Sequence, residues 1–292
     1  MKRRTILVSA LAAAVLPSCG GKKDSAEKVR RFSAIPDQNK TELKEKFDKM
    51  AEHLSKELGV KVEYKPSSDY KASVESFAQG DVLLAWFGGL TGVQARHRVE
   101  GAHAIAQGIA DPNYFSYFIA HKDSGLEKSD DFPKEIAGKS FTFGSESSTS
   151  GRLMPEFFIR EFTEKSPEEF LGAKPAFSGS HDATAKAVES GKVMVGALSY
   201  KAYDKLVAKG EIDPEVCKVI WKTPFYADYN WTAHPDLESK FGEGFTEKVK
   251  QVLLAMPKDL LQAFPRDAMI EAKDSDFQGI VDVAKELGFL KQ

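Results

Sequence analysis

The apolar run Val82-Leu83-Leu84-Ala85-Trp86 decides the fold class of this chain. An unbroken run of this length is typical of a strand that is covered on both faces, as in a parallel sheet. The residues before it predict two strands and two helices in alternation, at 31–36, 43–58, 60–64 and 70–79. Gly59 and Gly80 follow the two helices as C-terminal caps. The series strand, helix, strand, helix, strand indicates an α/β fold.

The same alternation returns in the second half of the chain. Strands are expected at 139–143, 193–198 and 216–221, and helices at 153–162, 183–189, 200–208, 245–256 and 276–287. The pattern predicts two α/β lobes with mixed, mostly parallel sheets and a ligand cleft between them. We expect lobe 1 to contain 28–120 and 224–292, and lobe 2 to contain 121–223. Two segments then cross between the lobes and act as hinges.

Composition excludes several classes of protein. The 292 residues suffice for two domains of ordinary size. Lys and Arg number 41 and Asp and Glu 43, which gives a formal net charge of -2. Nucleic-acid-binding surfaces are usually basic, so we expect no nucleic-acid partner. Two cysteines are too few for a disulfide framework, and Cys217 is interpreted as a buried packing residue.

The first residues predict an export signal. Residues 1–18 begin with the basic Lys2 to Arg4, and the apolar run that follows is too short to span a bilayer as a helix. Leu16-Pro17-Ser18-Cys19 resembles a bacterial lipobox, so we expect cleavage before Cys19 and a lipid on that residue. Residues 19–27 are polar and predict a short tether. The protein is then exported, periplasmic or at the cell surface, and anchored to the membrane. A plain signal peptide is the alternative.

Residues 141–151, Phe-Thr-Phe-Gly-Ser-Glu-Ser-Ser-Thr-Ser-Gly, place a cluster of hydroxyls between a predicted strand and a predicted helix. Such a junction offers unpaired backbone N–H groups, the positive end of a helix and several hydroxyl donors at one point. It predicts a cradle for an anion. Ordinary N-capping by one Ser or Thr is the alternative interpretation. The stretch lacks the Gly-Lys of a P-loop, so the sequence gives no support for nucleotide hydrolysis.

Five stretches, taken in order, resemble the phosphate/phosphite/phosphonate substrate-binding proteins of ABC importers. They are 32–36, 68–70, 85–91, 148–151 and 223–228. Residues 85–94 and 105–108 are most similar to a branch provisionally assigned to selenate. The resemblance extends over roughly residues 31–257 and implies a two-lobe periplasmic-binding-protein fold, type II-like. It also implies a monomer that delivers a small tetrahedral oxyanion to an ABC permease and its ATPase, without catalysis and without a cofactor.

The resemblance also implies a set of ligand-binding residues. In that family two tyrosines, a Ser-Thr-Ser turn, a histidine and an aspartate hold the oxyanion. By order and local context these roles fall on Tyr70, Tyr114, Ser148, Thr149, Ser150, His181 and Asp228. Tyr117 is the alternative to Tyr114. Aminophosphonate binders carry a further acidic group where this chain has Ser199, so recognition of a ligand ammonium group is not expected.

The two indications of ligand identity disagree. Hydroxyls and backbone N–H groups donate to ligand oxygens without a full counter-charge, and His181 adds a donor. The carboxylate of Asp228 accepts a hydrogen bond from a protonated phosphate, phosphite or phosphonate, whereas it meets only lone pairs on selenate. The carboxylate therefore favours protonated oxyanions, and the branch similarity favours selenate.

Two other functions remain as alternatives. One is an enzyme that uses Ser148 as a nucleophile with His181 as its base, although a third, orienting group is not evident. The other is a sensor that binds the same oxyanion and signals to a membrane partner. The histidines are scattered without metal-site spacing, so we expect no metal.

Overall fold

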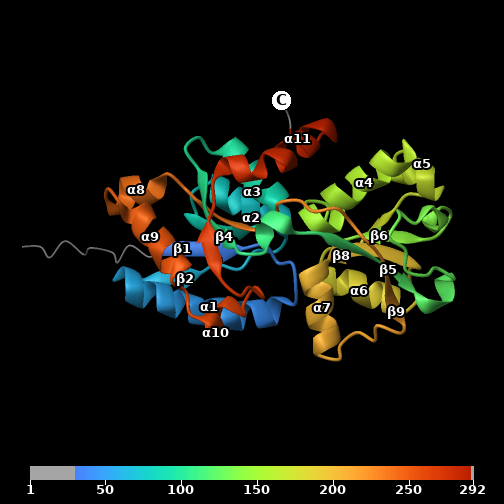
Figure 1. Ribbon diagram of the computed structural model, residues 1–292. Coiled ribbons are helices and arrows are strands. Elements are labelled where there is room, and N and C mark those ends of the chain that lie inside the picture. Colours follow the sequence, from blue (N-terminus) through green and yellow to red (C-terminus); the bar gives the residue numbers. More distant parts are fainter. Residues whose placement is uncertain (1–29, 291–292) are drawn as a thin grey trace, which may run out of the picture.

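The computed structural model describes residues 30–290. These residues form two mixed sheets, each covered by helices (Figure 1). The two-lobe α/β fold expected from the alternating pattern is confirmed. The predicted signal peptide 1–18, the lipid site Cys19 and the tether 19–27 lie outside the described residues. Among residues 30–290, no helix combines the length and apolar character needed to cross a bilayer.

The first sheet has the strand order β11-β4-β10-β3-β1-β2. Its strands are β1 (Arg30–Ala34), β2 (Val62–Tyr64), β3 (Leu84–Phe87), β4 (His103–Gly108), β10 (Asn230–Ala233) and β11 (Met269–Glu271). β1 pairs in parallel with β2 and β3, while β10 runs antiparallel between β3 and β4. β11 is antiparallel to β4. The strand β3 contains the last three residues of the apolar run together with Phe87, and all four of its residues are buried.

Helices cover both faces of this sheet. They are α1 (Lys40–Leu58), α2 (Tyr70–Ala78), α3 (Gly89–Arg98), α8 (Asp236–Phe241), α9 (Phe245–Leu254), α10 (Lys258–Leu261) and α11 (Gln278–Glu286). Figure 1 shows α1 below the sheet and α2 and α3 above it. The Asn39 side chain caps α1, and Gly59 ends it in the left-handed conformation with φ 71°. The Asp69 side chain caps α2 by accepting from the N–H of Ala72.

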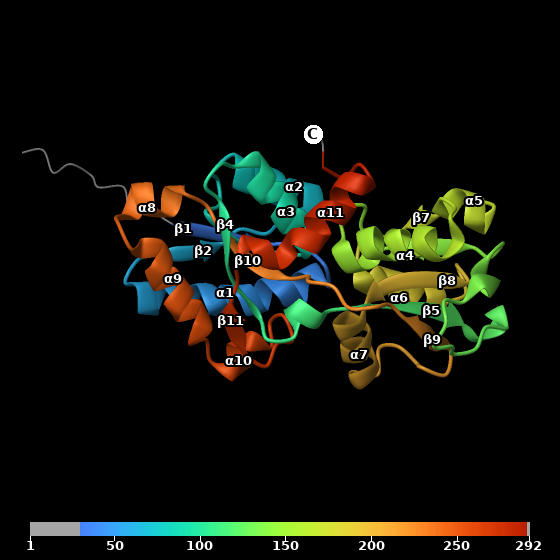
Figure 2. The same ribbon diagram turned by 45° about the horizontal axis from the view of Figure 1, so that its top comes forward.

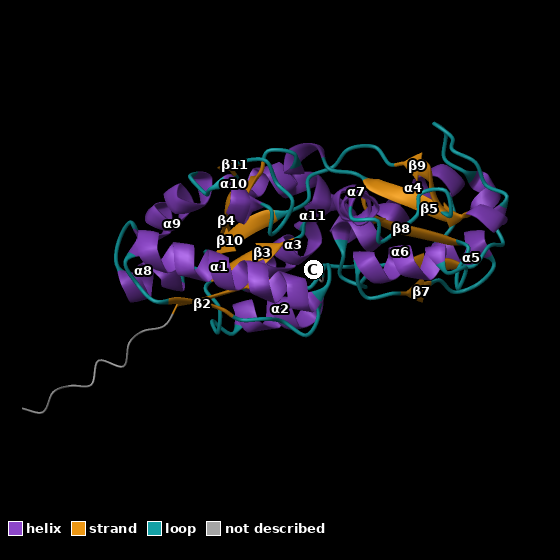
Figure 3. Cartoon of the chain, turned by 90° about the horizontal axis from the view of Figure 1, so that it is seen from below, coloured by secondary structure: helices purple, strands orange, loops and turns teal. Residues whose placement is uncertain are grey.

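The second sheet has the order β7-β6-β8-β5-β9. Its strands are β5 (Ser116–His121), β6 (Phe141–Phe143), β7 (Ala176–Phe177), β8 (Val195–Ser199) and β9 (Cys217–Lys222). Around it lie α4 (Met154–Thr163), α5 (Pro167–Leu171), α6 (His181–Glu189) and α7 (Tyr200–Ala208). Only β5 runs antiparallel to its neighbours, β8 and β9. Figure 3 shows the orange strands of both sheets among the purple helices.

Two chain segments cross side by side between the sheets (Figure 2). The backbones of Tyr114 and Tyr226 exchange two hydrogen bonds of 2.9 Å, and the N–H of Thr223 donates to the Ser116 carbonyl over 3.0 Å. The expected lobe boundaries at 120/121 and 223/224 remain predictions. Because β5 belongs to the second sheet from Ser116 onward, the first crossing lies before that residue.

Candidate functional site

The seven residues proposed from the sequence are all buried where the two sheets approach each other. Tyr70, Tyr114, Ser148, Thr149, Ser150, His181 and Asp228 are each at most 2% exposed. They come from six places in the chain: the start of α2, the first crossing, the loop after β6, a short π-helical turn, the start of α6 and the second crossing. Burial of this many hydroxyl and ionisable groups is unusual in a protein interior, where polar side chains are mostly exposed.

The Ser-Thr-Ser turn is shaped by hydrogen bonds to its own backbone. Residues 149–153 form one π-helical turn that leads directly into α4. The N–H of Gly151 donates to the Ser148 hydroxyl over 3.0 Å, and the N–H of Gly144 donates to the Gly151 carbonyl over 2.7 Å. A Cβ atom at position 151 would lie 2.9 Å from Oγ of Ser148 and 3.3 Å from Cε1 of His181. Glycine therefore allows the turn to approach His181 closely.

The N-terminus of α3 meets the turn and Asp228. The N–H of Gly89 donates to Oδ1 of Asp228 over 2.8 Å, and the N–H of Leu90 donates to Oγ1 of Thr149 over 2.9 Å. A Cβ atom at Gly88 would lie 3.1 Å from Thr149 Oγ1 and 3.2 Å from Asp228 Oδ1. The positive end of a helix thus faces a hydroxyl from one sheet and a carboxyl from the second crossing. Sequence reasoning assigned no ligand role to residues 88–90.

Two buried polar atoms at this point lack a hydrogen-bond partner among the described residues. They are the hydroxyl oxygen of Tyr70 and Oδ2 of Asp228. The Tyr70 hydroxyl lies beside Ser148, and the Asp228 carboxyl lies beside Thr149 and Ser150. Neither the Tyr70 hydroxyl oxygen nor Oδ2 of Asp228 has one of these neighbours in hydrogen-bonding geometry. Buried polar groups in proteins are nearly always paired. Two unpaired atoms in one cluster therefore mark a place where a polar ligand gains hydrogen bonds.

Burial changes the charge of the site. It raises the pKa of Asp228 to about 7, against the opposing effect of the Gly89 N–H. It lowers the pKa of His181 to about 3, so the imidazole is neutral at neutral pH. The site therefore presents neutral donors together with one carboxyl that changes protonation near neutrality. Such a set suits an anion that carries, or shares, a proton.

Tyr114 and His181 meet at the end of β8. The Tyr114 hydroxyl is hydrogen-bonded to the Ser199 hydroxyl, and the N–H of Ser199 donates to Nδ1 of His181 over 3.4 Å. Tyr117, the alternative to Tyr114, instead packs edge-on against Tyr203 with ring centroids 5.6 Å apart. The geometry therefore brings Tyr114, and not Tyr117, to the other six residues.

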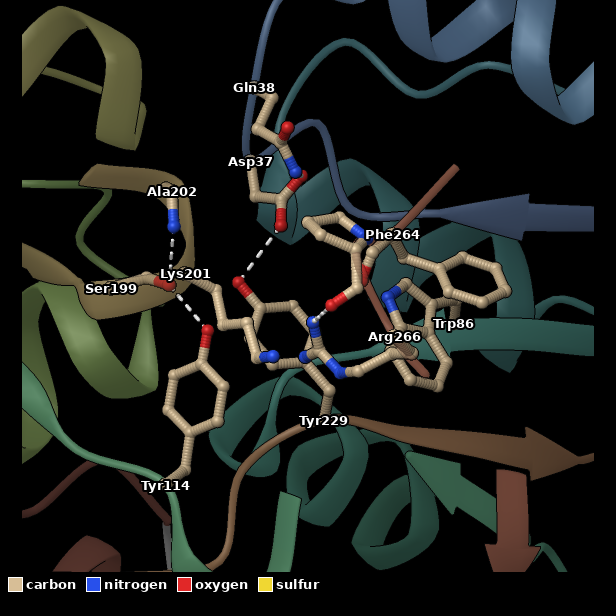
Figure 4. A pocket seen from close by; sticks show the side chains of 11 residues that line it. Asp37, Gln38, Trp86, Tyr114, Ser199, Lys201, Ala202, Tyr229, Phe264 and Arg266 are labelled. Atoms are coloured by element: carbon tan, nitrogen blue, oxygen red, sulfur yellow. Dashed lines mark hydrogen bonds between the residues drawn. The ribbon is translucent and has the colours of Figure 1, made fainter. Parts of the chain in front are cut away.

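Three neighbours of the site were missed from the sequence, namely Asp37, Asp111 and Arg266. Asp37 and Tyr229 are joined by a hydrogen bond of 2.8 Å, and Arg266 forms a buried, bidentate pair with Asp111. Asp37, Tyr229 and Arg266 line a small cavity of about 10 Å³ beside Tyr114 (Figure 4). Asp37 follows the first matched stretch by one residue, which is a weak signal. Arg266 lies outside all five stretches, so sequence reasoning had no means to find it.

Among residues 30–290, no group of three or more His, Cys, Asp or Glu side chains is arranged to hold a metal ion. Cys217 is buried and unpaired in the second core cluster. Its sulfur lies 3.8 Å from the Ala185 carbonyl, and burial raises its pKa to about 12. This environment fits a packing residue and not a reactive thiol.

Comparison with known proteins identifies the family. The family model described as "ABC transporter, phosphonate, periplasmic substrate-binding protein" matches residues 32–277. The chain belongs to this family. Its members bind substrates for ABC transporters and are not enzymes, which agrees with the expectation of a binding protein. The family resemblance found in the sequence is thereby confirmed.

Two curated relatives and one solved structure illustrate the similarity. The chain is 38% identical over 275 residues to the probable ABC transporter phosphite binding protein PhnD1 of Prochlorococcus marinus (strain MIT 9301), covering 91% of this chain and 92% of that protein. It is 35% identical over 217 residues to the phosphate-import protein PhnD of Mycolicibacterium smegmatis, covering 70% and 66%. The structure of PhnD1 in complex with methylphosphonate superposes with a TM-score of 0.85, covering 90% of this chain and all of that one.

Proposed function

We propose that this protein captures a small phosphorus oxyanion, such as phosphite or methylphosphonate, between its two lobes and delivers it to an ABC permease and its ATPase. The observation that carries the proposal is that two unpaired buried atoms, the Tyr70 hydroxyl and Oδ2 of Asp228, lie in one cluster with the Ser-Thr-Ser turn and the N-terminus of α3. A relative that is 38% identical is named a probable phosphite-binding protein, and its structure contains methylphosphonate. Both ligands fit a cluster of neutral donors around one carboxyl.

The seven buried residues divide into donors and one proton-sharing group. Tyr70, Ser148, Thr149, Ser150 and the N–H groups of the turn donate to ligand oxygens, and Tyr114 and His181 complete the cradle from the side of β8. Asp228 shares one proton with the ligand, because a raised pKa makes its neutral form accessible near pH 7. A phosphite or phosphonate brings a proton of its own to this pair.

Selenate is the competing ligand. It is fully ionised near neutral pH, so the shared proton must come from Asp228 alone, and that supply falls as the pH rises through about 7. We therefore place phosphorus oxyanions above selenate.

Isothermal titration tests this order directly. The panel is phosphite, methylphosphonate, phosphate, 2-aminoethylphosphonate, selenate and sulfate, each titrated into the same protein preparation. We expect saturable one-to-one binding of phosphite or methylphosphonate, weaker binding of 2-aminoethylphosphonate, and no turnover of any compound. Absence of binding across the panel contradicts the proposal, and a preference for selenate overturns the role given to Asp228.

The cellular location is proposed from the N-terminal sequence. We infer that residues 1–18 are removed, that Cys19 carries a lipid, and that residues 19–27 tether a monomeric two-lobe body to the membrane. Metabolic labelling with a fatty acid should mark the native chain and fail to mark Cys19→Ser. Labelling of both chains, or of neither, contradicts the anchor at Cys19.

A further inference from the structure

Three buried residues form a hydrogen-bonded chain between the two sheets. The Tyr229 hydroxyl donates to Oδ2 of Asp37 over 2.8 Å, and the same hydroxyl lies 3.4 Å from Nε2 of His181. Asp37 is 6% exposed, Tyr229 4% and His181 1%. Asp37 follows β1 of the first sheet, and His181 begins α6, which covers the second. Figure 4 shows the bond from Tyr229 to Asp37 at the edge of the small cavity.

The bonds around His181 define which of its nitrogens carries the proton. The N–H of Ser199 donates to Nδ1, so Nδ1 holds a lone pair. Burial keeps the imidazole neutral by lowering its pKa to about 3, and in a neutral imidazole the other nitrogen then carries the proton. Nε2–H therefore donates to the Tyr229 oxygen. That oxygen is free to accept because the hydroxyl proton is directed to Asp37.

Tyr229 is held in place independently of its hydroxyl. Its ring stacks on Trp86, with centroids 5.6 Å apart and planes inclined by 21°. The guanidinium carbon of Arg266 lies 4.8 Å from the centroid of the same ring. On the other side, the backbone N–H of His181 donates to the Asp37 carbonyl over 3.1 Å. The imidazole is thus fixed at its backbone and at both ring nitrogens.

We propose that Asp37 is a positioning residue that acts through Tyr229 to hold His181 in the tautomer with its proton on Nε2 and so to fix the imidazole ring against the Ser-Thr-Ser turn of the oxyanion site. The proposal rests on the proposed function and adds to it two residues that do not belong to the predicted donor set. A carboxyl buried near an anion repels it, and the opposing charges of Arg266 and Lys205 reduce that repulsion. Asp37 accepts the hydroxyl proton of Tyr229 in a hydrogen bond, and the tyrosine oxygen is therefore free to accept from His181.

The first test needs no ligand. In the ligand-free protein, the Nε2–H proton of His181 should give a slowly exchanging NMR signal, identified by its disappearance in His181→Leu. We expect this signal to shift or vanish in Asp37→Asn and in Tyr229→Phe, which keeps the stacked ring. Tyr203→Phe is the matched control, because Tyr203 is also buried and donates its hydroxyl to the Cys217 carbonyl in the second core. An unchanged signal in both variants overturns the proposal.

The second test is a double-mutant cycle on ligand affinity, measured with phosphite and methylphosphonate. Asp37→Asn should weaken binding about tenfold in the native background, the effect of roughly one hydrogen bond. In the His181→Leu background the same change should alter affinity less than about twofold, because a positioning residue acts through the group that it positions. Equal losses in both backgrounds contradict the proposal.

If His181→Leu abolishes binding, the NMR signal alone decides. If the native protein binds no oxyanion, the proposed function fails while the NMR test still stands.

Discussion

Thr149 is the side chain by which the second sheet reaches the N-terminus of α3. Its Oγ1 accepts the N–H of Leu90 over 2.9 Å in a fully buried position. The sequence indicated a hydroxyl cluster here, but not that one hydroxyl accepts from a helix of the other lobe. That fact depends on how two sheets pack, and no local pattern encodes it. Asp37 and Arg266 were missed for the same reason.

Replacing Thr149 with Val keeps the shape of the side chain and removes the acceptor of the Leu90 N–H. A buried donor without a partner costs roughly 1–3 kcal/mol, and this cost applies only where the two lobes meet. We therefore expect oxyanion affinity by titration calorimetry to fall about tenfold or more. Thr163→Val is the control, since the Thr163 hydroxyl bonds only at the C-terminal end of α4, where it donates to the Ile159 carbonyl and accepts from the N–H of Lys165. Equal affinity in both variants would show that the cradle lies elsewhere.

Asp228 and His181 give the stability opposite dependences on pH. The folded pKa of Asp228, about 7, is above the ordinary 3.8, so its contribution is fully present below 3.8 and is lost as the pH rises through about 7. The folded pKa of His181, about 3, is below the ordinary 6.5. Its contribution is present above 6.5 and is lost as the pH falls through about 3.

Asp228→Asn isolates the first of these effects. The amide cannot ionise, and its Oδ1 still accepts from Gly89. Relative to the native protein, the variant should therefore gain stability as the pH rises, by up to roughly 2–4 kcal/mol at alkaline pH. Urea denaturation between about pH 5 and about pH 9 measures the difference. Asp81→Asn, an exposed residue paired with Lys65, serves as the control. A difference that does not vary with pH contradicts a buried, titrating Asp228.

At the scale of elements, the sequence predicted most of the helices of residues 30–290 but not α3, α5, α8 and α10. α1 has apolar residues at regular helical spacing, a cap at Asn39 and a left-handed Gly59, and each feature is local. The strands β4, β5, β7, β10 and β11 were not placed in advance. β10 lies between β3 and β4 although more than 120 residues separate it from them along the chain, so its partners are defined only by the folded topology. β11 is a three-residue edge strand with a single buried residue, too short for a clear pattern.

The π-helical turn before α4 depends on a glycine at position 151. An alanine Cβ there would lie 2.9 Å from the Ser148 hydroxyl and 3.3 Å from the His181 ring, closer than side-chain carbons normally approach. We expect Gly151→Ala to push the turn and the histidine apart and to weaken oxyanion binding about tenfold, with a smaller loss of stability. Gly144→Ala is matched to it, because a Cβ at position 144 meets its nearest neighbour at an ordinary 3.4 Å. Similar affinities for the two variants would rule out close packing of the turn against His181.

At the scale of the whole molecule, a second set of contacts joins the lobes away from the buried site. Glu42, in the first turn of α1, forms ion pairs with Lys205 of α7 at 3.6 Å and with Lys209, the C-cap of α7, at 2.8 Å. The N–H of Asn39 donates to Oδ2 of Asp182 over 2.9 Å. None of these interactions involves any of the seven proposed ligand-binding residues. They stabilise the arrangement in which the two lobes are in contact, and they contribute nothing once the lobes separate.

Glu42→Gln should therefore weaken oxyanion binding without changing the cradle. Exposed ion pairs are worth roughly 0–1 kcal/mol each, so the loss of two should reduce affinity about two- to tenfold by making closure less favourable. Because salt screens such pairs, the difference from the native protein should shrink as ionic strength increases.

Calorimetry at low and high salt measures both effects, and small-angle scattering should show a more open ligand-free molecule. Asp81→Asn breaks an ion pair with Lys65 inside the first lobe and should leave affinity unchanged. A loss of affinity in Glu42→Gln that persists at high salt would contradict an electrostatic contribution to closure, since only the charge of residue 42 differs between the two proteins.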